Sequence, residues 1–432
     1  MREPGTTRTT LDAVWRIESA RVIAAVAHLV RDVGLAEDLA QDAFVAALEQ
    51  WPRDGVPARC GAWLTAVAKR RAIDHLRRRQ RFDERLPILG RRQVVEEEEV
   101  QTDFDAVADP KEIRDDLLRL ICTACHPVLS REARVALTLR LVGGLRTDEI
   151  ARAFLLPEGT VAQRIVRAKR TLTAAHVPFE VPQRAQLAER LGSVLEVLYL
   201  IFNEGYAATA GDDWMRPALC EDALRLGRVV ATLAPLEAEV HGLVALMEIQ
   251  ASRLRARTGP DGELVLLLDQ NRARWDHVLI RRGLAALDRA IALGGARGPY
   301  ALQAAIAACH ARAITPETTD WPRIAALYTA LAALTPSPVI ELNRAVAVAM
   351  AFGPAAGLEL VDALAGDPSL AHYHLLPSVR GDLLARLGRL DEARRELERA
   401  ADLAGNARER DLLLARAAAC GRRDVVRGAD SG

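Results

Sequence analysis

The sequence has few of the features that mark membrane, secreted or disulfide-stabilised proteins. Its 432 residues contain no uninterrupted apolar run of about 18 residues, which excludes a transmembrane helix. Residues 1–10 are polar and contain no apolar stretch, so we expect no signal peptide. Six cysteines scattered over this length do not form a disulfide framework. We therefore expect a soluble cytoplasmic protein.

A net charge and catalytic motifs are also lacking. Lys+Arg and Asp+Glu each number 58, so only the local distribution of charge can indicate a partner. There is no glycine-rich phosphate loop, nucleophile elbow or pair of metal ligands. Acids such as Glu204 and Asp212 lie near turns, where helix capping explains them. The sequence gives no support for an enzyme, and we expect no cofactor.

Apolar residues, by contrast, make up 50% of the chain and recur at a spacing of three to four almost everywhere. This predicts an all-α protein, and the length predicts more than one domain. Breaks in composition divide the chain into four parts. They are a first block (11–81), an acidic flexible linker (82–112), a second block (113–176) and a helical extension (183–425).

The extension shows a weak internal repeat. The stretch Leu383–Leu403 has small residues where paired helices would cross, and Ala347–Ala365 has a similar pattern about 35 residues earlier. This spacing resembles tetratricopeptide repeats and predicts such units at about 320–405. The apolar stretch Val194–Tyr206 predicts a core helix.

Residues 141–172 have the pattern of a helix-turn-helix. Gly143-Gly144 should end one helix, and Thr147 should cap the next. The inward residues of that next helix are Ile150, Ala151 and Phe154. A turn at 155–159 leads to a last helix, which Thr160 opens and in which Thr160 and Gln163 fit a capping box. The inward stripe of the last helix is Val161, Ile165, Ala168 and Leu172.

The outward face of this last helix is polar and basic, without an acid. It consists of Thr160, Gln163, Arg164, Arg167, Lys169 and Arg170. Such a helix can enter a major groove, contact base edges near its N-terminus and bind phosphates further along. Two other interpretations remain open at this point. The helix could be half of a hairpin with a solvated basic face, and a capping role would keep Gln163 from reading a base.

The helix-turn-helix resembles region 4 of the extracytoplasmic-function (ECF) sigma factors. The matching residues are Glu149-Ile150-Ala151, Glu158-Gly159-Thr160-Val161, Arg164 and Arg167-Ala168-Lys169. The resemblance implies that the six outward residues named above read the −35 promoter element. DNA-binding domains of response regulators share much of this pattern, so the stretch alone leaves both families open.

The first block separates the two families. Residues 33–48 predict an amphipathic helix, with Leu39, Ala43, Phe44 or Val45, and Leu48 on its apolar side and with Glu37, Asp38, Gln41 and Asp42 on its polar side. A loop broken by proline and glycine, Trp51–Gly61, comes next. Residues 62–79 then predict a second helix, with Leu64, Val67, Ile73 and Leu76 inward and its cations outward.

This pair of helices resembles sigma region 2, through AEDLAQDAF (36–44) and AIDHLRRR (72–79). The resemblance implies that the first helix docks on core RNA polymerase through Asp38, Leu39, Gln41, Asp42 and Phe44. It also implies that the −10 element is bound by Arg53, Arg59, Trp63, Lys69, Arg70, Asp74, His75, Arg77 and Arg78. The loop has few aromatic residues for stacking on bases. A core role for Trp63 and a solvated helix end at Arg77–Arg79 remain open.

One motif points elsewhere. Cys122-Thr-Ala-Cys125-His126 matches the haem attachment pattern C-x-x-C-H. Haem attachment of this kind needs export, for which there is no signal. A thiol redox switch or a zinc switch is a second interpretation, and core packing of two cysteines on one helix face is the third. We expect core packing.

The leading hypothesis is a sigma factor that binds core RNA polymerase and recognises −10 and −35 elements. Helical extensions of this size occur in one branch of the ECF family, and the resemblance implies regulation in cis, in which the extension masks or supports promoter binding. Two other classes remain open. One is a helix-turn-helix repressor or activator, and the other is a helical-repeat scaffold without sigma activity.

Overall fold

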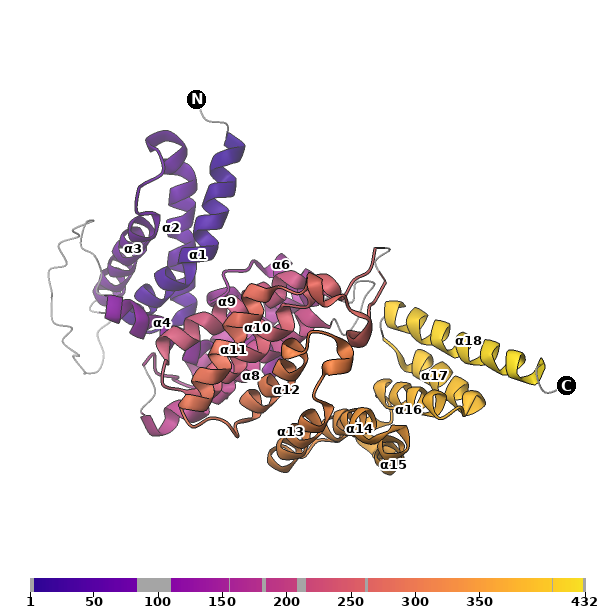
Figure 1. Ribbon diagram of the computed structural model, residues 1–432. Coiled ribbons are helices and arrows are strands. Elements are labelled where there is room, and N and C mark those ends of the chain that lie inside the picture. Colours follow the sequence, from indigo (N-terminus) through magenta and orange to yellow (C-terminus); the bar gives the residue numbers. More distant parts are fainter. Residues whose placement is uncertain are drawn as a thin grey trace. The chain divides into compact units, whose positions relative to one another are not determined.

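The structure is a computed structural model (Figure 1) that describes residues 4–83, 110–154, 156–180, 184–207, 215–260, 263–405 and 407–429. It divides into two compact units, Met1–Leu198 and Tyr199–Gly432. In the described ranges the regular elements are α-helices and short 3-10 turns, and the β-pairing is one isolated bridge between Thr258 and Leu264. The predicted all-α class is confirmed. The acidic linker predicted at 82–112 falls largely on residues 84–109, which lie outside these ranges.

The helices of the first unit are α1 (Pro4–Val30), α2 (Val33–Asp54), α3 (Cys60–Asp83), α4 (Pro110–Ala124), α5 (Arg131–Leu141), α6 (Thr147–Phe154), α7 (Glu158–Ala174) and the first part of α8 (Arg184–Tyr206). Those of the second unit are the end of α8, α9 (Pro217–Leu233), α10 (Ala238–Ala251), α11 (His277–Ala292), α12 (Pro299–Arg312), α13 (Trp321–Leu334), α14 (Pro338–Phe352), α15 (Pro354–Leu364), α16 (Leu375–Arg386), α17 (Leu390–Leu403) and α18 (Ala407–Ala429).

The first block is a three-helix assembly in which α1 packs along both α2 and α3 (Figure 1). Small residues line the contact, because α2 buries Ala36, Ala40, Ala43 and Ala47 at helical spacing. Alanine side chains let two helix backbones approach closely. Asp32 begins α2 by accepting hydrogen bonds at Oδ1 from the backbone nitrogens of Gly34 (2.7 Å) and Leu35 (2.9 Å).

The loop between α2 and α3 is shorter than the predicted Trp51–Gly61. Helix α2 continues through Pro52 to Asp54, and α3 already begins at Cys60. Pro52 is exposed in the last turn of α2, and because it has no N–H it leaves one intrahelical hydrogen bond unmade there. Gly55 ends α2 with φ +89°, a conformation that favours glycine.

Helices α4 to α7 form the second block, with α5 and α6 both packed on α7. The predicted stripe on α7 is confirmed, since Val161, Ile165, Ala168 and Leu172 are all buried. The predicted caps are wrong. Thr147 is the first helical residue of α6, and α7 begins at Glu158 with Pro157 before it, so Thr160 is inside the helix and forms no capping box with Gln163.

The start of α8 belongs to the first unit and is bonded to α4 and α5. Ser193 Oγ donates to the carbonyl of Cys125 (2.6 Å) and accepts from Arg134 (2.5 Å). Glu196 forms ion pairs with Arg131 (2.5 Å) and Arg134 (3.2 Å). The second block is therefore stabilised by residues that follow it in the chain.

In the second unit, consecutive helices from α13 to α18 pack against each other in sequence. Gly353 separates α14 from α15 with φ +102°, at the turn that the sequence predicts. Ala393 and Ala400 of α17 are fully buried, as their small size at a helix crossing suggests. The arrangement fits stacked helical hairpins, and the resemblance to tetratricopeptide repeats stays a prediction.

Within the described ranges, no helix is long and apolar enough to cross a membrane.

Candidate nucleic-acid interface

The outward face of α7 is positively charged. Gln163, Arg167 and Arg170 are exposed, and Arg164 is half-buried. Of the carboxylates in the described ranges, none forms an ion pair with Arg164, Arg167 or Arg170. Because the helix starts at Glu158, the amide of Gln163 is free of the capping role considered above. This face can therefore offer an amide near the helix start and guanidinium groups further along, which suits base edges and phosphates.

Lys169 differs from its neighbours on α7. Its Nζ lies 2.5 Å from Glu37 Oε2 and 3.9 Å from Asp38 Oδ1, both on α2 of the first block. The side chain is only 20% exposed. Lys169 is thus bound to a helix of the other block instead of facing solvent.

The exposed side of α3 is a second cationic surface. Arg70, Arg77 and Arg78 are exposed, and Lys69 and His75 are half-buried. The charge extends to Arg53 at the end of α2 and to Arg59 in the loop, both exposed. The acid among the expected −10 residues, Asp74, is exposed on the same side, and its carbonyl accepts from Arg78 Nε (3.2 Å).

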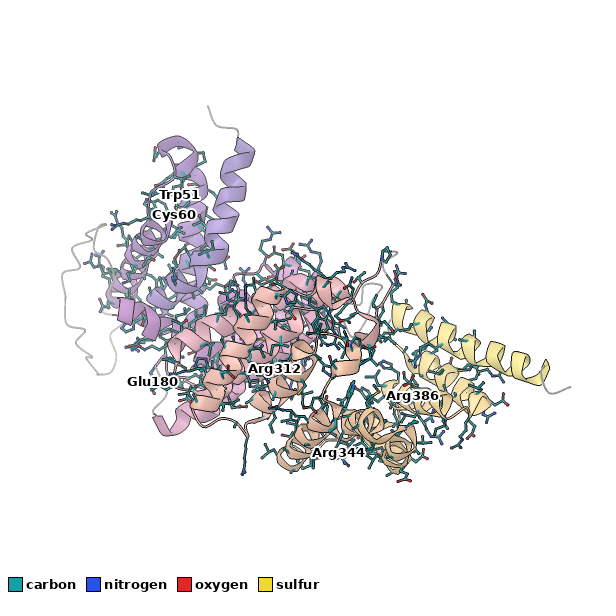
Figure 2. All side chains as sticks on the ribbon, in the orientation of Figure 1. Trp51, Cys60, Glu180, Arg312, Arg344 and Arg386 are labelled. Atoms are coloured by element: carbon teal, nitrogen blue, oxygen red, sulfur yellow. The ribbon has the colours of Figure 1, made fainter. Side chains whose placement is uncertain are left out.

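The two tryptophans at the edges of the loop pack on each other. Trp51 is buried and meets Trp63 edge-on, with ring centroids 5.4 Å apart. Figure 2 shows Trp51 beside Cys60, where α2 ends and α3 begins. Trp51 is therefore core, while Trp63 is half-buried and keeps part of its ring accessible.

The expected polymerase-docking residues of α2 do not lie on one exposed face. Asp38 and Asp42 are exposed, and Asp42 lies 3.5 Å from Arg71. Leu39 is buried in the core, and Phe44 packs on Trp15 with ring centroids 4.8 Å apart. Gln41 is half-buried and donates to Glu37 (2.6 Å).

The predicted apolar side of α2 is wrong at Leu48, and of the two alternatives Phe44 and Val45 it is Phe44 that packs inward. Val45 is 49% exposed and Leu48 is 37% exposed, because Ala43, Ala46 and Ala47 fill the space against α1 and α3. These two residues continue the exposed stripe of Asp38 and Asp42. The stripe therefore presents two carboxylates beside two apolar side chains. The spacing of the large apolar residues alone did not predict it.

Glu37 was expected on the polar side of α2, yet it is buried between the two blocks. Its Oε1 accepts from Arg140 Nε of α5 (2.5 Å) and from Gln41, while Oε2 pairs with Lys169. The positions of Arg140 and Lys169, both more than a hundred residues away, leave no signal in the local sequence around Glu37. We call Glu37, Arg140 and Lys169 the inter-block triad.

Further bonds connect the blocks around this triad. Thr173 Oγ1 of α7 donates to Asp32 Oδ2 (3.1 Å), and Arg31 donates to the carbonyl of Phe179 (3.1 Å). On the other side, Asp116 of α4 lies 2.9 Å from His28 Nδ1 of α1. The two blocks are thus held in one compact unit by polar contacts along α1 and α2.

The C-x-x-C-H motif lies in the core of the second block. Cys122 and Cys125 are buried, and Cys125 Sγ lies 3.2 Å from Thr138 Oγ1. Burial raises the pKa of Cys122 to about 11 and that of Cys125 to about 12, which keeps both thiols protonated. Burial and the charge of Arg190 lower the pKa of His126 to about 4. In the described ranges no cluster of ligands could hold a metal ion.

Comparison with known proteins now bears on both blocks. Residues 16–82 match the family model for sigma-70 region 2, and residues 120–172 match that for sigma-70 region 4. The ECF RNA polymerase sigma factor SigK of Mycobacterium tuberculosis (strain H37Rv) is 29% identical over 157 residues, 35% of this chain and 78% of SigK. The SigK of Mycobacterium ulcerans has the same identity over 156 residues and covers the same shares of the two chains. The chain is an ECF-type sigma-70 factor.

Two further matches include the extension. An uncharacterised protein of Rhizobium meliloti (strain 1021) is 43% identical over 396 residues, 90% of each chain, so the chain belongs to the same family over nearly its full length. Residues 190–291 match a family of unknown function (DUF6596). No solved structure matches.

The protonated state of the buried thiols gives a chemical test of their role. Since the thiolate is the reactive form, iodoacetamide at pH 8 should leave Cys122 and Cys125 unmodified in the native sigma factor and should alkylate both in guanidinium. Peptide mass spectrometry measures this, with half-buried Cys60 as internal reference. Native alkylation of Cys122 at the unfolded rate would show a reactive thiol instead of a core residue.

Proposed function

We propose that this sigma factor binds core RNA polymerase and directs promoter-specific initiation, with α7 at the −35 element and α3 at the −10 element. The unpaired cationic face of α7, with Gln163 free at its N-terminal end, is the observation that carries the −35 assignment. A guanidinium contributes both a charge for phosphate and a bidentate fork for guanine. Gln163 suits adenine.

The exposed cations of α3 support the −10 assignment. Unpaired bases of a melted promoter need a positive surface along the backbone and at least one ring for stacking. Arg70, Arg77 and Arg59 provide the charge, and Trp63 is the one tryptophan of the Trp51–Trp63 pair that remains partly accessible.

For polymerase docking we propose the exposed stripe of α2, namely Asp38, Asp42, Val45 and Leu48. Exposed apolar residues rimmed by charge are typical of protein interfaces. The proposed docking site therefore differs from the expected one, which included the inward-facing Leu39 and Phe44. Leu39 and Phe44 then support the stripe from within the first block and do not contact the partner directly.

The closed first unit cannot occupy both promoter elements. By their names the two elements are about 25 base pairs apart, roughly 85 Å of duplex. Lys169, a proposed −35 residue, is at the same time bound to α2. The two blocks must therefore separate on a promoter.

We further propose that the extension acts in cis on region 4. Helix α8 is continuous from Arg184 to Tyr206, and its first part is bonded to α4 and α5 through Ser193 and Glu196. The helix that contains the boundary between the two units therefore also contacts the helix-turn-helix block, which supports this proposal.

Run-off transcription with core polymerase on a promoter library tests sigma activity. We expect initiation with the wild type, and a loss of roughly ten-fold or more in output for Gln163→Ala and for Arg167→Gln. Arg167→Gln should also lower the salt slope of binding by about 0.9. Arg152→Gln, an exposed change on α6, is the control. Tight duplex binding without core enzyme would favour an ordinary regulator, and polymerase binding without initiation would favour a scaffold.

Removing one member of the inter-block triad should increase the affinity of the chain for core polymerase. Arg140→Gln removes a charge-assisted hydrogen bond from buried Glu37, worth about 1.5–3 kcal/mol, and should favour the open form roughly ten-fold or more. Affinity for core polymerase should rise, because Lys169 lies 3.9 Å from Asp38 of the docking stripe in the closed form, and opening leaves a larger fraction of the chain with this stripe unobstructed. Fluorescence anisotropy measures this, with Arg140→Lys keeping the charge and Arg152→Gln as matched control. Equal affinity for all three variants would contradict a closed state that opens on binding.

Truncation tests regulation in cis. The cut belongs after Leu198, because Ser193 and Glu196 stabilise the second block. Compared with the full chain at equal active concentration, the truncated protein should change run-off output at least several-fold. Circular dichroism checks that it remains folded. Identical output in all conditions would rule out control by the extension.

A further inference from the structure

The second unit contains a largely buried group of polar side chains around Trp275, whose ring packs in a small core with Ala256 and Ile280. We call Arg253, Gln270, Arg272, Trp275 and His310 the Trp275 cluster. The guanidinium carbons of Arg253 and Arg272 lie 5.8 Å and 5.1 Å from the Trp275 ring. His310 joins the cluster from α12, since its carbonyl accepts from Arg272 (2.8 Å).

Both arginines are fixed in place by neutral groups. Arg253 donates to the hydroxyl of Tyr206 (2.7 Å) and to the side chain of Gln250. Arg272 donates to the carbonyl of Ala313 (2.6 Å) and to Thr319 Oγ1 (3.2 Å). Of the carboxylates in the described ranges, none forms an ion pair with either guanidinium. Neither cation has an ion-paired carboxylate, and for the buried Arg253 this is costly.

The cluster also has hydrogen-bonding atoms that no protein atom of the described ranges satisfies. They are Nε of Arg253, Nε of Arg272, Nε1 of Trp275, Nδ1 of His310 and Oε1 of Gln270. The residues Arg253, Gln270, Trp275 and His310 are 4–8% exposed. Unsatisfied buried polar atoms are rare in proteins, and those of Arg253, Arg272 and the Trp275 ring that both arginines approach indicate a ligand. Three of these five atoms are N–H donors, so the complement is an acceptor.

The positive charge of the cluster contributes to a shift in the pKa of His310. Burial, together with the positive charges of Arg253 and Arg272, lowers the pKa of His310 to about 4. Glu317 is the carboxylate whose negative charge acts to raise the pKa of Arg272, and it is fully exposed. The field within the cluster is thus positive, and a negative ligand would relieve it.

We propose that the Trp275 cluster binds a small oxyanion of the carboxylate or phosphate type. Two guanidinium groups and an indole N–H suit its acceptor oxygens, and Gln270 Oε1 can accept from a hydroxyl group of the same ligand. The 4–8% exposure of the lining side chains favours a small ligand over an acidic segment of a partner protein. The extension would then be the ligand-binding part of the chain. Binding is measured without transcription, so this proposal stands independently of the proposed function.

Isothermal titration calorimetry of the full-length protein tests this directly. Inorganic phosphate and acetate are titrated separately, to distinguish the two sources of the oxyanion, against chloride at equal ionic strength. We expect saturable binding of one oxyanion per chain, and a rise in the Tm of the second unit with its concentration. Saturation by neither oxyanion, as expected if water alone fills the cluster, would overturn the proposal.

Variants locate the site. Arg272→Gln should weaken binding roughly ten-fold or more through loss of one charge-assisted hydrogen bond. Trp275→Phe keeps the ring and removes only the N–H donor, so it decides the question if Arg272→Gln fails to fold. Arg274→Gln is the matched control, because Arg274 lies in the same 3-10 turn but is exposed. Wild-type affinity in both Arg272→Gln and Trp275→Phe would place the anion elsewhere and overturn the proposal.

Discussion

A single buried carboxylate, Glu37, sets the arrangement of the two sigma regions. A charge removed from water costs several kcal/mol unless it is paired, and both cations that pair with Glu37 come from region 4. Region 2 alone would leave Glu37 with only the amide of Gln41. The closed unit is therefore favoured wherever nothing else supplies charge to α2, and its stability depends on residues of both regions at once.

This dependence couples the two proposed surfaces. Lys169 belongs to the DNA-facing helix, whereas Glu37 lies next to the exposed stripe of α2. The proposed −35 target would compete with the triad for Lys169, and Asp38 of the proposed docking stripe lies 3.9 Å from the same Lys169 Nζ. Binding at either proposed surface would therefore favour the open form. Region 4 is joined to the extension by α8. Under the proposed regulation in cis, a ligand bound at the Trp275 cluster would shift the equilibrium between the closed and open forms of the first unit.

Much of this organisation could be predicted from the sequence, because periodicity reports which side of a helix is buried. The stripe of α7 and the helical extension follow from it. The errors have physical reasons. Leu48 was expected inward because large apolar residues usually are, but alanines already fill that interface. The capping box failed because α7 begins at Glu158, two residues before Thr160. The cationic partners of Glu37, and Tyr206 beside Arg253, are distant in the chain and leave no local pattern.

The distance between the two sigma regions is the most direct measure of this account. Spin labels at Arg79 of α3 and Val166 of α7, both exposed, would be placed in a Cys60→Ser background and measured by double electron–electron resonance. We expect a narrow distribution of short label-to-label distances in the free sigma factor. With core polymerase and promoter, the distances should be longer by tens of ångströms. One unchanged distribution in both states would contradict it.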